Sequence, residues 1–334
     1  MLRDGDGRHK AVQRLLPVVL LVCCCAVVVG LEIDNPYADV DWSQAQRLKV
    51  NLHTHTKRSD GRMEPAVVID AYRAQDYAAL AITDHNRATW PWTAFGRDPD
   101  EIGMFAIAGN EFSNGHHRNA LFAPVAENPG ADVARSAHMV AAAGGLLQLN
   151  HPGRYDKPPQ WYVDLIREHE VIVSLEVFNQ GDRYRRDRKL WDAILARSMP
   201  QRPLWGSSND DMHSKEHLFR NYNIVLAEER SLTALRASLV AGRSWFSHEP
   251  EGSGAAEAPR IDAIAVNDAV ITITAPEARI TWIANGERVA AGATVDVATL
   301  VGAGLVGGYI RARLENGDGV TCTQPFGVHR DTER

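Results

Sequence analysis

Two histidines, His53 and His55, stand on either side of a threonine in the stretch LHTHT, near the start of the hydrophilic part of the chain. Side chains two apart on a β-strand project from the same face, so an extended backbone presents both imidazoles together. Imidazole is the most common metal ligand in proteins. A lone pair of this kind is more often two polar side chains at the wet end of a strand, so its meaning depends on what other segments bring to the same place.

Side chains that can bind metal recur at the ends of five further apolar segments. They are Asp84 and His85 in AITDH, Glu111 in AGNEF, His116 and His117 in NGHHRNALF, His151 in LQLNHPG, and Asp211 and His213 in GSSNDDMH. Each segment alone could be a helix cap, a loop carboxylate or a turn. Five coincidences at strand ends are less probable than one shared site, so the sequence predicts a metal site.

Short apolar runs alternate with amphipathic stretches from Lys49 to about Ser247. We expect strands over residues 48–55, 78–85, 104–112, 119–125, 145–151, 171–179, 203–210 and 221–227, and helices over residues 64–75, 132–144, 188–198 and 231–242. Such alternation predicts a mainly parallel sheet, open or closed into a barrel. Active residues of such barrels gather at the carboxyl ends of the strands, where the candidate ligands fall.

The composition changes after this region, and residues 249–259, rich in Gly, Ala, Pro and Glu, are expected to form a linker. Beyond it, short alternating runs are separated by Asn-Gly, Gly-Ala and Gly-Asp turns. This pattern predicts a small all-β, sandwich-like domain over residues 260–330. The domain could pack on the barrel, contact other envelope components or simply stabilise the protein.

The N-terminus predicts a targeting segment over residues 1–31. Arg3, Arg8, Lys10 and Arg14 precede an apolar run over residues 15–31, which fits either a signal peptide or an N-terminal membrane anchor. Both interpretations export the rest of the chain, to a periplasmic or other extracytoplasmic location, and the charges favour a cytoplasmic N-terminus. This segment is expected to contact the membrane or the export machinery.

Charge and cysteine content narrow the function further. The formal net charge of -6 offers no broad basic surface, which argues against long nucleic acids as partners and leaves a short nucleotide substrate open. Cys23, Cys24 and Cys25 lie in the apolar run, so Cys322 is alone in the exported part. An internal disulfide or a thiolate metal site is therefore excluded there.

The segments LHTHTKRSDG, ITDH, GNEF and NHPG and the final Asp-x-His, in this order, resemble the polymerase and histidinol phosphatase (PHP) superfamily of metal-dependent phosphoesterases. The resemblance runs from about Val50 to Ser247. It implies a distorted seven-stranded β/α barrel, over residues 45–248 here, with up to three divalent metal ions at the carboxyl ends of its strands. Nitrogen and oxygen ligands without thiolate suit zinc, manganese or iron.

The resemblance also implies which side chains hold each ion. His53, His55, Glu111 and Asp211 would bind one metal, with Glu111 bridging to a second that His117 and His151 complete, and Asp60, His85 and His213 would hold the third. His116 competes with His117, which we prefer because a strand through Asn119 and Leu121 puts it on their face. Asp210 competes with Asp211, which we prefer for its spacing to His213.

Other charged residues near these motifs have less specific interpretations. Asp84 is expected to orient a histidine. Glu176 could support a ligand, contact the substrate or have no role. Arg154, after His151-Pro152-Gly153, is the first candidate for binding phosphate and Lys57 the second. The arginines of DRYRRDRK, residues 182–189, are most simply a solvated helix start, although they could reach an anionic substrate.

These features predict an exported phosphoesterase that hydrolyses a small phosphomonoester or phosphodiester with a metal-bridging hydroxide. Glu111, Asp211, His213 and Arg154 are the residues expected to contribute to catalysis. His213, Asp60 or a metal-bound water could protonate the leaving alcohol. Two alternatives are a non-enzymatic, metal-loaded envelope binding protein and a metal-dependent hydrolase of a non-phosphate substrate. The sequence leaves the oligomeric state undefined.

Overall fold

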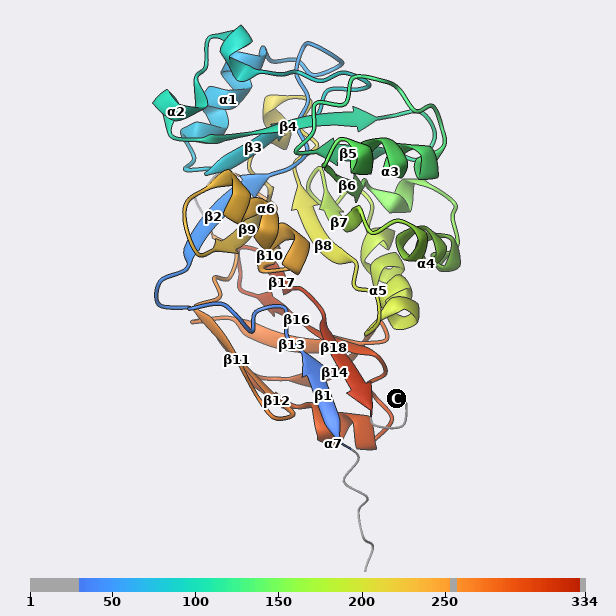
Figure 1. Cartoon of the computed structure of the whole chain (residues 1–334). Coiled ribbons are helices and arrows are strands. Elements are labelled where there is room, and N and C mark those ends of the chain that lie inside the picture. The colour runs from blue at the N-terminus through green and yellow to red at the C-terminus, as the bar shows by residue number, and fades with distance from the viewer. Residues whose placement is uncertain (1–29, 253–256, 331–334) are drawn as a thin grey trace, which may run out of the picture.

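The computed structural model describes residues 30–252 and 257–330. Figure 1 shows an α/β part above a smaller part built mostly of strands. The strands of the α/β part are β2 (Gln46–Asn51), β3 (Ala79–Ile82), β4 (Phe105–Phe112), β5 (Arg118–Leu121), β6 (Leu146–Leu149), β7 (Ile172–Asn179), β8 (Trp205–Asn209), β9 (Asn221–Ala227) and β10 (Ser244–His248). Its helices are α1 (Pro65–Arg73), α2 (Pro99–Ile102), α3 (Val133–Ala142), α4 (Pro159–Glu168), α5 (Arg186–Ser198) and α6 (Leu232–Ala241), with the 3-10 helices η1 (Trp92–Phe95), η2 (Pro152–Arg154) and η3 (Lys215–His217).

Local signals account for the predicted helices, all four of which are confirmed. Helix α3 begins after Asp132, whose side chain accepts a hydrogen bond from the backbone N–H of Arg135, and α6 begins after Ser231 in the same way. Both are N-cap residues that satisfy an otherwise unpaired donor. Helix α6 ends at Gly242, where a positive φ of 72° suits glycine.

The strands of the α/β part form one mixed sheet in the order β10-β9-β2-β3-β4-β5-β6-β7-β8. Strands β2, β3 and β4 are parallel, as are β6, β7 and β8, whereas β5 is antiparallel to both of its neighbours. Strands β9 and β10 are also antiparallel to their partners. The expected α/β class is confirmed, although the sheet is less parallel than predicted.

Closure of the sheet into the predicted barrel would require β8 to pair with β9. No backbone ladder joins these two strands within the described residues, so closure by strand pairing is not seen. A side chain spans the gap instead: Asn223 Oδ1 accepts from the backbone N–H of Ser208 at 3.0 Å, and Asn223 Nδ2 donates to the Ser208 carbonyl at 2.9 Å.

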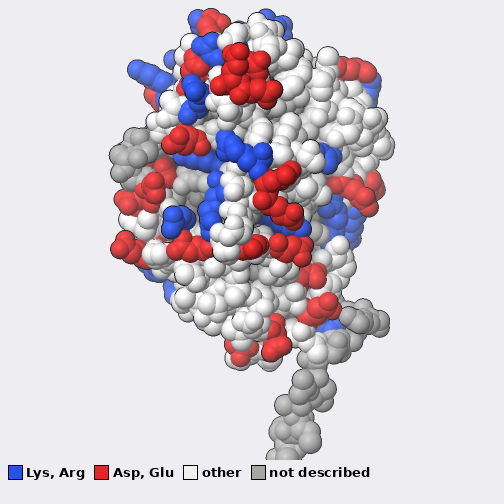
Figure 2. Space-filling model, turned by 60° about the vertical axis from the view of Figure 1, so that its left-hand side comes forward, with Lys and Arg blue, Asp and Glu red and all other residues white. Residues whose placement is uncertain are grey.

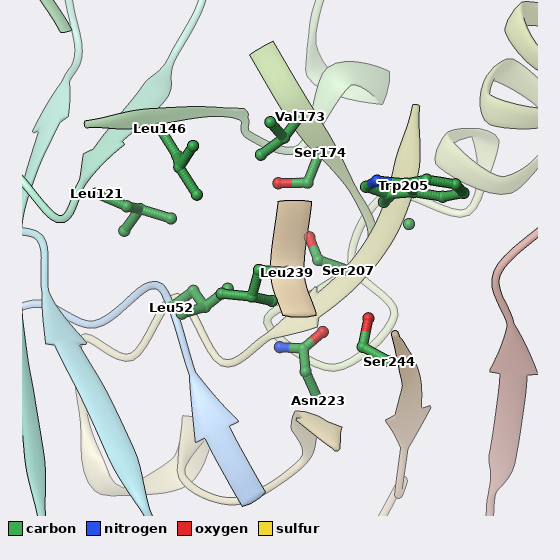
Figure 3. Close-up of a pocket in the computed structure, with 11 residues that line it drawn as sticks. Leu52, Leu121, Leu146, Val173, Ser174, Trp205, Ser207, Asn223, Leu239 and Ser244 are labelled. Atoms are coloured by element: carbon green, nitrogen blue, oxygen red, sulfur yellow. The ribbon is translucent and has the colours of Figure 1, made fainter. Parts of the chain in front are cut away.

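Amides and hydroxyls fill the interior of the curved sheet and leave little space. Ser207 Oγ donates to Gln148 Oε1 at 3.0 Å, and Asn223 Nδ2 donates to Asn209 Oδ1 at 3.0 Å. Figure 3 shows a cavity beside this network, with leucines on one side and Ser174, Ser207 and Asn223 on the other. Its volume of about 20 Å³ holds a single water at most, so a substrate must bind elsewhere.

The strand-rich part continues the same sheet. It contains β11 (Ala263–Asn267), β12 (Val270–Thr274), β13 (Arg279–Ala284), β14 (Glu287–Ala291), β15 (Thr294–Asp296), α7 (Val297–Gly302), β16 (Tyr309–Glu315), β17 (Val320–Thr323) and β18 (Phe326–Arg330). Strand β17 pairs with β10, while β11, β12 and β15 form a separate sheet. Both sheets contribute to one core, which includes Ile273 and Trp282, so this part is sandwich-like as predicted.

One further strand precedes the α/β part in sequence but joins the other end of the molecule. Strand β1 (Leu31–Asp34) pairs with β18, beside which Figure 1 shows it. Apart from Gly30 and Leu31, the predicted targeting segment lies outside the described residues. Among the residues that the structure describes, no helix combines the length and the hydropathy needed to cross a membrane.

Candidate metal centre

The strand ends bring the predicted ligands to one edge of the sheet. His53 and His55 follow β2, Asp60 lies in the loop beyond them, His85 follows β3, Glu111 lies near the end of β4, His117 precedes β5, His151 follows β6, and Asp211 and His213 follow β8. Isolated bridges join Thr54 to Met212 and His85 to Glu111. The first bridge holds the segment after β2 beside the segment after β8. The second holds the segment after β3 beside the end of β4.

The first group of ligand atoms lies deepest. Nε2 of His53 is 3.1 Å from Nε2 of His55, and Oδ1 of Asp211 is 3.2 Å and 3.0 Å from these two nitrogens. Oε1 of Glu111 lies 3.3 Å from His53 Nε2. Both imidazoles are fully buried. The structure therefore brings together the four side chains assigned to one metal by the family resemblance.

Glu111 links this group to the next. Its Oε1 lies 3.0 Å from Nδ1 of His117 and 3.4 Å from Nε2 of His151. His116 faces elsewhere, with Nε2 3.0 Å from the Tyr162 hydroxyl and Nδ1 donating to the carbonyl of His117. The geometry thus supports the choice of His117 over its neighbour.

The third group lies nearer to solvent around Asp60. Oδ2 of Asp60 is 3.4 Å from Nε2 of His85 and 3.3 Å from Nε2 of His213. Two histidines also reach across groups: His55 Nδ1 is 3.8 Å from Asp60 Oδ1, and His85 Nδ1 is 2.8 Å from Glu111 Oε2. The sets that can converge on one point are accordingly His55, Asp60, His85 and His213; His53, His55 and Asp211; and His85, Glu111 and His117.

Several of these atoms have no hydrogen-bond partner. Within the described residues, the Nδ1 atoms of His55 and His151 are buried and have no hydrogen-bond partner, while Nδ1 of His85 and Oε2 of Glu111 have only their 2.8 Å contact with each other. Buried polar atoms normally find partners, so converging nitrogens and oxygens with so few of them fit divalent cations among them. The donor atoms are those that zinc, manganese and iron accept.

The electrostatics of the cluster also favour a cation. Burial raises the pKa of the Glu111 carboxyl, but the histidines around it, His53 first, outweigh burial and hold that pKa well below its usual value. The same balance lowers the pKa of Asp211. Burial by itself lowers the pKa of the His53 imidazole, yet Asp211 and other carboxylates raise it well above its usual value. The surroundings therefore stabilise positive charge at this point.

Glu176 positions two of the candidate ligands. Its Oε1 lies 2.9 Å from Nδ1 of His53, and its Oε2 accepts from the backbone N–H of His151 at 2.9 Å. Asn209 Nδ2 donates to Oε1 at 3.0 Å. Of the three roles left open by the sequence, support of a ligand is the one that these contacts favour.

The prediction that Asp84 orients a histidine is wrong. Its carboxylate accepts from the backbone N–H of Thr56 at 2.7 Å, from the Thr56 hydroxyl at 2.6 Å and from the Ser59 hydroxyl at 2.7 Å. Asp84 is buried and bonds the loop that leads to Asp60. It therefore acts on a candidate ligand through the backbone.

The neighbours Asp210 and Asp211 have separate environments. Asp210 Oδ2 accepts from the Tyr72 hydroxyl at 2.6 Å, and Oδ1 accepts from the backbone N–H of Asn221 at 2.9 Å. Burial raises the pKa of Asp210 to about 7, whereas that of Asp211 is lowered. Asp210 is thus a buried anchor for the segment before β9, and Asp211 faces the histidines.

An open cleft of about 390 Å³ gives access to the cluster. It is lined by Asp60, His85, Glu111, His117, His151, Arg154, Gln180, Arg183, Asp211, His213 and His217. Arg154 is where a phosphate-binding residue was expected, whereas Lys57 pairs with Glu64 Oε1 at 3.0 Å. Sequence reasoning missed Gln180 and His217. Their only signal in the sequence is position, because Gln180 directly follows β7 and His217 lies four residues after His213.

No protein-family model matches this sequence, and no curated protein matches it either. Its fold resembles that of a two-domain protein from Bacteroides vulgatus that contains a predicted PHP-like metal-dependent phosphoesterase, with 18% identity, a TM-score of 0.53 and coverage of 86% of this chain and 88% of the other. A protein from Bifidobacterium adolescentis proposed to be a metal-dependent phosphoesterase is similar over 50% of this chain and 88% of its own (17% identity, TM-score 0.41). The lesion-specific endonuclease EndoQ from Pyrococcus furiosus is similar over 58% of this chain and 56% of its own (14% identity, TM-score 0.45).

The likeness to the Bacteroides protein extends over most of both chains. At this level of identity it concerns the fold alone. The chain therefore has a PHP-like fold, and the resemblance seen in its motifs is confirmed at the level of the fold.

Proposed function

We propose that the chain belongs to the PHP superfamily and is a metal-dependent hydrolase of a small phosphomonoester or phosphodiester. The observation that supports this most is the convergence of nine histidine and carboxylate side chains from separate strand ends, with Glu111 between the groups. A binding protein without turnover would need the cleft for its ligand, but it would not need a carboxylate shared between groups of metal ligands.

Three sets of side chains would hold the ions, in the groups described above. Divalent ions supply neutralisation of the phosphate charge and activation of a water for in-line attack. Glu111 lies between two of the sets because its Oε2 faces His55 and its Oε1 faces His117. Arg154, at the end of the turn that begins at His151, is suited to bind an ester phosphate oxygen through its planar guanidinium.

Hydrogen bonds fix the tautomers of two histidines. Nδ1 of His213 donates to the backbone carbonyl of Asp211 at 2.7 Å, which leaves the lone pair of Nε2 directed toward Asp60. Nδ1 of His53 faces Glu176 and leaves its Nε2 toward Asp211 in the same way. These tautomers suit metal ligands. The hydrogen bonds from His213 and His85 hold the pKa of Asp60 well below its usual value, so this carboxylate has no proton to give. We therefore favour water over His213 and Asp60 as the group that protonates the leaving alcohol.

We also propose that the protein is exported, through the basic and apolar pattern of residues 1–31. A long nucleic acid does not fit as a substrate, because the net charge is -6 and, on the face shown in Figure 2, acidic side chains border the basic ones. Cell fractionation and N-terminal sequencing of the mature protein test export and cleavage of the leader.

Metal analysis combined with an ester panel tests the function. Purified protein loaded with manganese or zinc should release p-nitrophenol from p-nitrophenyl phosphate or its bis ester. His55→Ala should lower both metal content and turnover, while His138→Ala, at an exposed position on α3, should change neither. Metal-loaded protein that hydrolyses no phosphate ester would contradict the proposal and favour the binding-protein or non-phosphate alternatives.

A further inference from the structure

Arg183 differs from the other arginines of residues 182–189. Arg185 Nε lies 3.6 Å from Asp182, Arg188 is paired with the same carboxylate, and Arg186 donates to the Tyr155 carbonyl at 3.2 Å. Arg183 lines the cleft and makes no ion pair within the described residues. Its charge therefore remains available to an anion in the cleft.

Gln180 holds Arg183 at a defined place beside the metal centre. Its Oε1 accepts from Nη1 of Arg183 at 2.9 Å, and its Nε2 donates to the backbone carbonyl of Asp211 at 3.1 Å. One amide thus connects the guanidinium to the segment that carries a candidate ligand. Gln180 has a φ of 45° and Asp211 a φ of 44°, a conformation that such side chains rarely adopt. Strained backbone of this kind clusters at functional sites.

His217 adds a neutral donor to the same side of the cleft. The backbone N–H of His213 donates to Nδ1 of His217 at 3.2 Å, so Nδ1 accepts and the proton of the neutral ring is on Nε2. Nε2 of Gln180 also lies 3.2 Å from this Nδ1. Arg183 and His217, which both contact Gln180, consequently add N–H groups to a cleft lining otherwise rich in histidines and carboxylates.

We propose that Arg183, braced by Gln180 and assisted by His217, binds a second anionic group of the substrate. The natural substrate would then be a small organic molecule with a phosphate ester at the metal centre, next to Arg154, and a further phosphate or carboxylate at Arg183. Both groups match the planar guanidinium fork. The reaction at the first phosphate rests on the proposed function. The preference for a second anion rests on Arg183 and does not require that function.

Paired substrates test the preference. The ratio of kcat/KM for fructose 1,6-bisphosphate to that for fructose 1-phosphate should exceed one in the metal-loaded protein and should fall by about tenfold or more in Arg183→Gln, because a charge-assisted hydrogen bond is lost. The matched control is Arg185→Gln, which removes an exposed arginine two positions away outside the cleft and should leave the ratio unchanged. The ratio for 3-phosphoglycerate against glycerol 3-phosphate tells whether a carboxylate serves as well as a phosphate.

Binding of inert analogues separates this inference from the proposed function. In calorimetry with the metal-loaded protein, propane-1,3-diphosphonate should bind more tightly than propylphosphonate, and Arg183→Gln should remove most of the difference. This binding result would support the second-anion site even if no ester were hydrolysed. The absence of hydrolysis would contradict the proposed function alone. Equal effects of Arg183→Gln and Arg185→Gln, or no preference for the diphosphonate, would overturn the inference while leaving the hydrolase activity intact.

Discussion

Two buried clusters of charge in this protein differ in how completely their polar atoms are hydrogen-bonded. Between α5 and β16, Asp192 accepts from Arg311 Nε at 2.8 Å, from Arg311 Nη2 at 2.7 Å and from the Tyr309 hydroxyl at 2.9 Å. Around Glu111, histidines and carboxylates lie almost as close, yet the buried Nδ1 atoms of His55 and His151 have no hydrogen-bond partner within the described residues.

The difference shows what each cluster is suited to do. A buried ion pair whose atoms are all satisfied has nothing left to offer a ligand, and it joins the α/β part to the strand-rich part. A buried cluster with unsatisfied atoms is unfavourable alone, and such clusters are typical of functional sites. Four predictions test this distinction.

The largest expected effect is that of Glu111→Gln in the open cluster. The amide keeps the size of the side chain but removes the charge shared by two groups of ligands, so metal content should fall and kcat/KM should drop roughly 10³-fold, which corresponds to the several kcal/mol that metal ions supply. Elemental analysis and p-nitrophenyl phosphate turnover measure both. Full metal content with activity within tenfold of the parent would contradict the assignment of Glu111.

Arg311→Met should have the next largest effect, on stability. It leaves Asp192 buried without its counter-charge, and the free energy of unfolding in urea should fall by about 3–5 kcal/mol. The double variant Asp192→Leu with Arg311→Met should lose much less, because no unpaired charge remains. The metal content of the folded fraction should be unchanged. A loss below about 1 kcal/mol in the single variant would mean that this cluster is not a closed ion pair.

Glu176→Gln should have an intermediate effect, on metal affinity. The carboxylate faces Nδ1 of His53, and loss of such a partner typically weakens metal binding by about 10–100-fold. Competition with a chelator measures the affinity. Glu168→Gln, at an exposed position on α4, is the control and should bind metal like the parent. If the two variants were alike, the contact between Glu176 and His53 would be incidental.

The last expected effect is a change in pH dependence at Asp187, which leaves the metal centre itself unchanged. Burial raises the pKa of this carboxyl from 3.8 to about 8, and it accepts from the backbone N–H of Gly153 in the turn after His151. The raised pKa means that the folded protein holds the proton more tightly than the unfolded chain. The stabilisation is complete below about pH 4 and is lost as the pH rises toward 8.

Asp187→Asn removes this dependence while keeping an acceptor for Gly153. Between pH 5 and 8 its free energy of unfolding should decline less steeply than that of the parent, by at most about 1.4 kcal/mol per pH unit. Urea unfolding at three pH values measures the slopes. Asp164→Asn, exposed on α4, should follow the parent. Parallel slopes for the parent and Asp187→Asn would show that Asp187 stays ionised.

Much of the fold could be predicted because helix caps and apolar periodicity are local signals. The direction of β5 was missed, although only Ser113 to His117 separate it from β4. A parallel crossover needs about a dozen residues, so this short connection allows only an antiparallel pair. Strand β1 could not be predicted, because its four residues have meaning only beside β18, at the far end of the chain.

The candidate ligands could be predicted as a set, but not their contacts. His55 and His85 each reach into two groups, which depends on rotamers and on distances between separate strands. The role of Asp84 was predicted wrongly for the same reason, since its partners are the hydroxyls and backbone of a loop. Which residues bind metal, and whether the ion is zinc, manganese or iron, stays a prediction.

By itself, the sequence determined which atoms could do chemistry and that they come at strand ends: imidazoles and carboxylates, with no cysteine among these motifs, and arginines nearby. Only the tertiary structure decided between chemically equivalent neighbours. Asp211 faces the histidines while Asp210 is bonded by Tyr72, and Arg183 lines the cleft while Arg185 faces solvent. The reason is physical: the burial of a side chain and the distances to its partners depend on segments far apart in the chain, whereas its chemical nature depends only on the residue type.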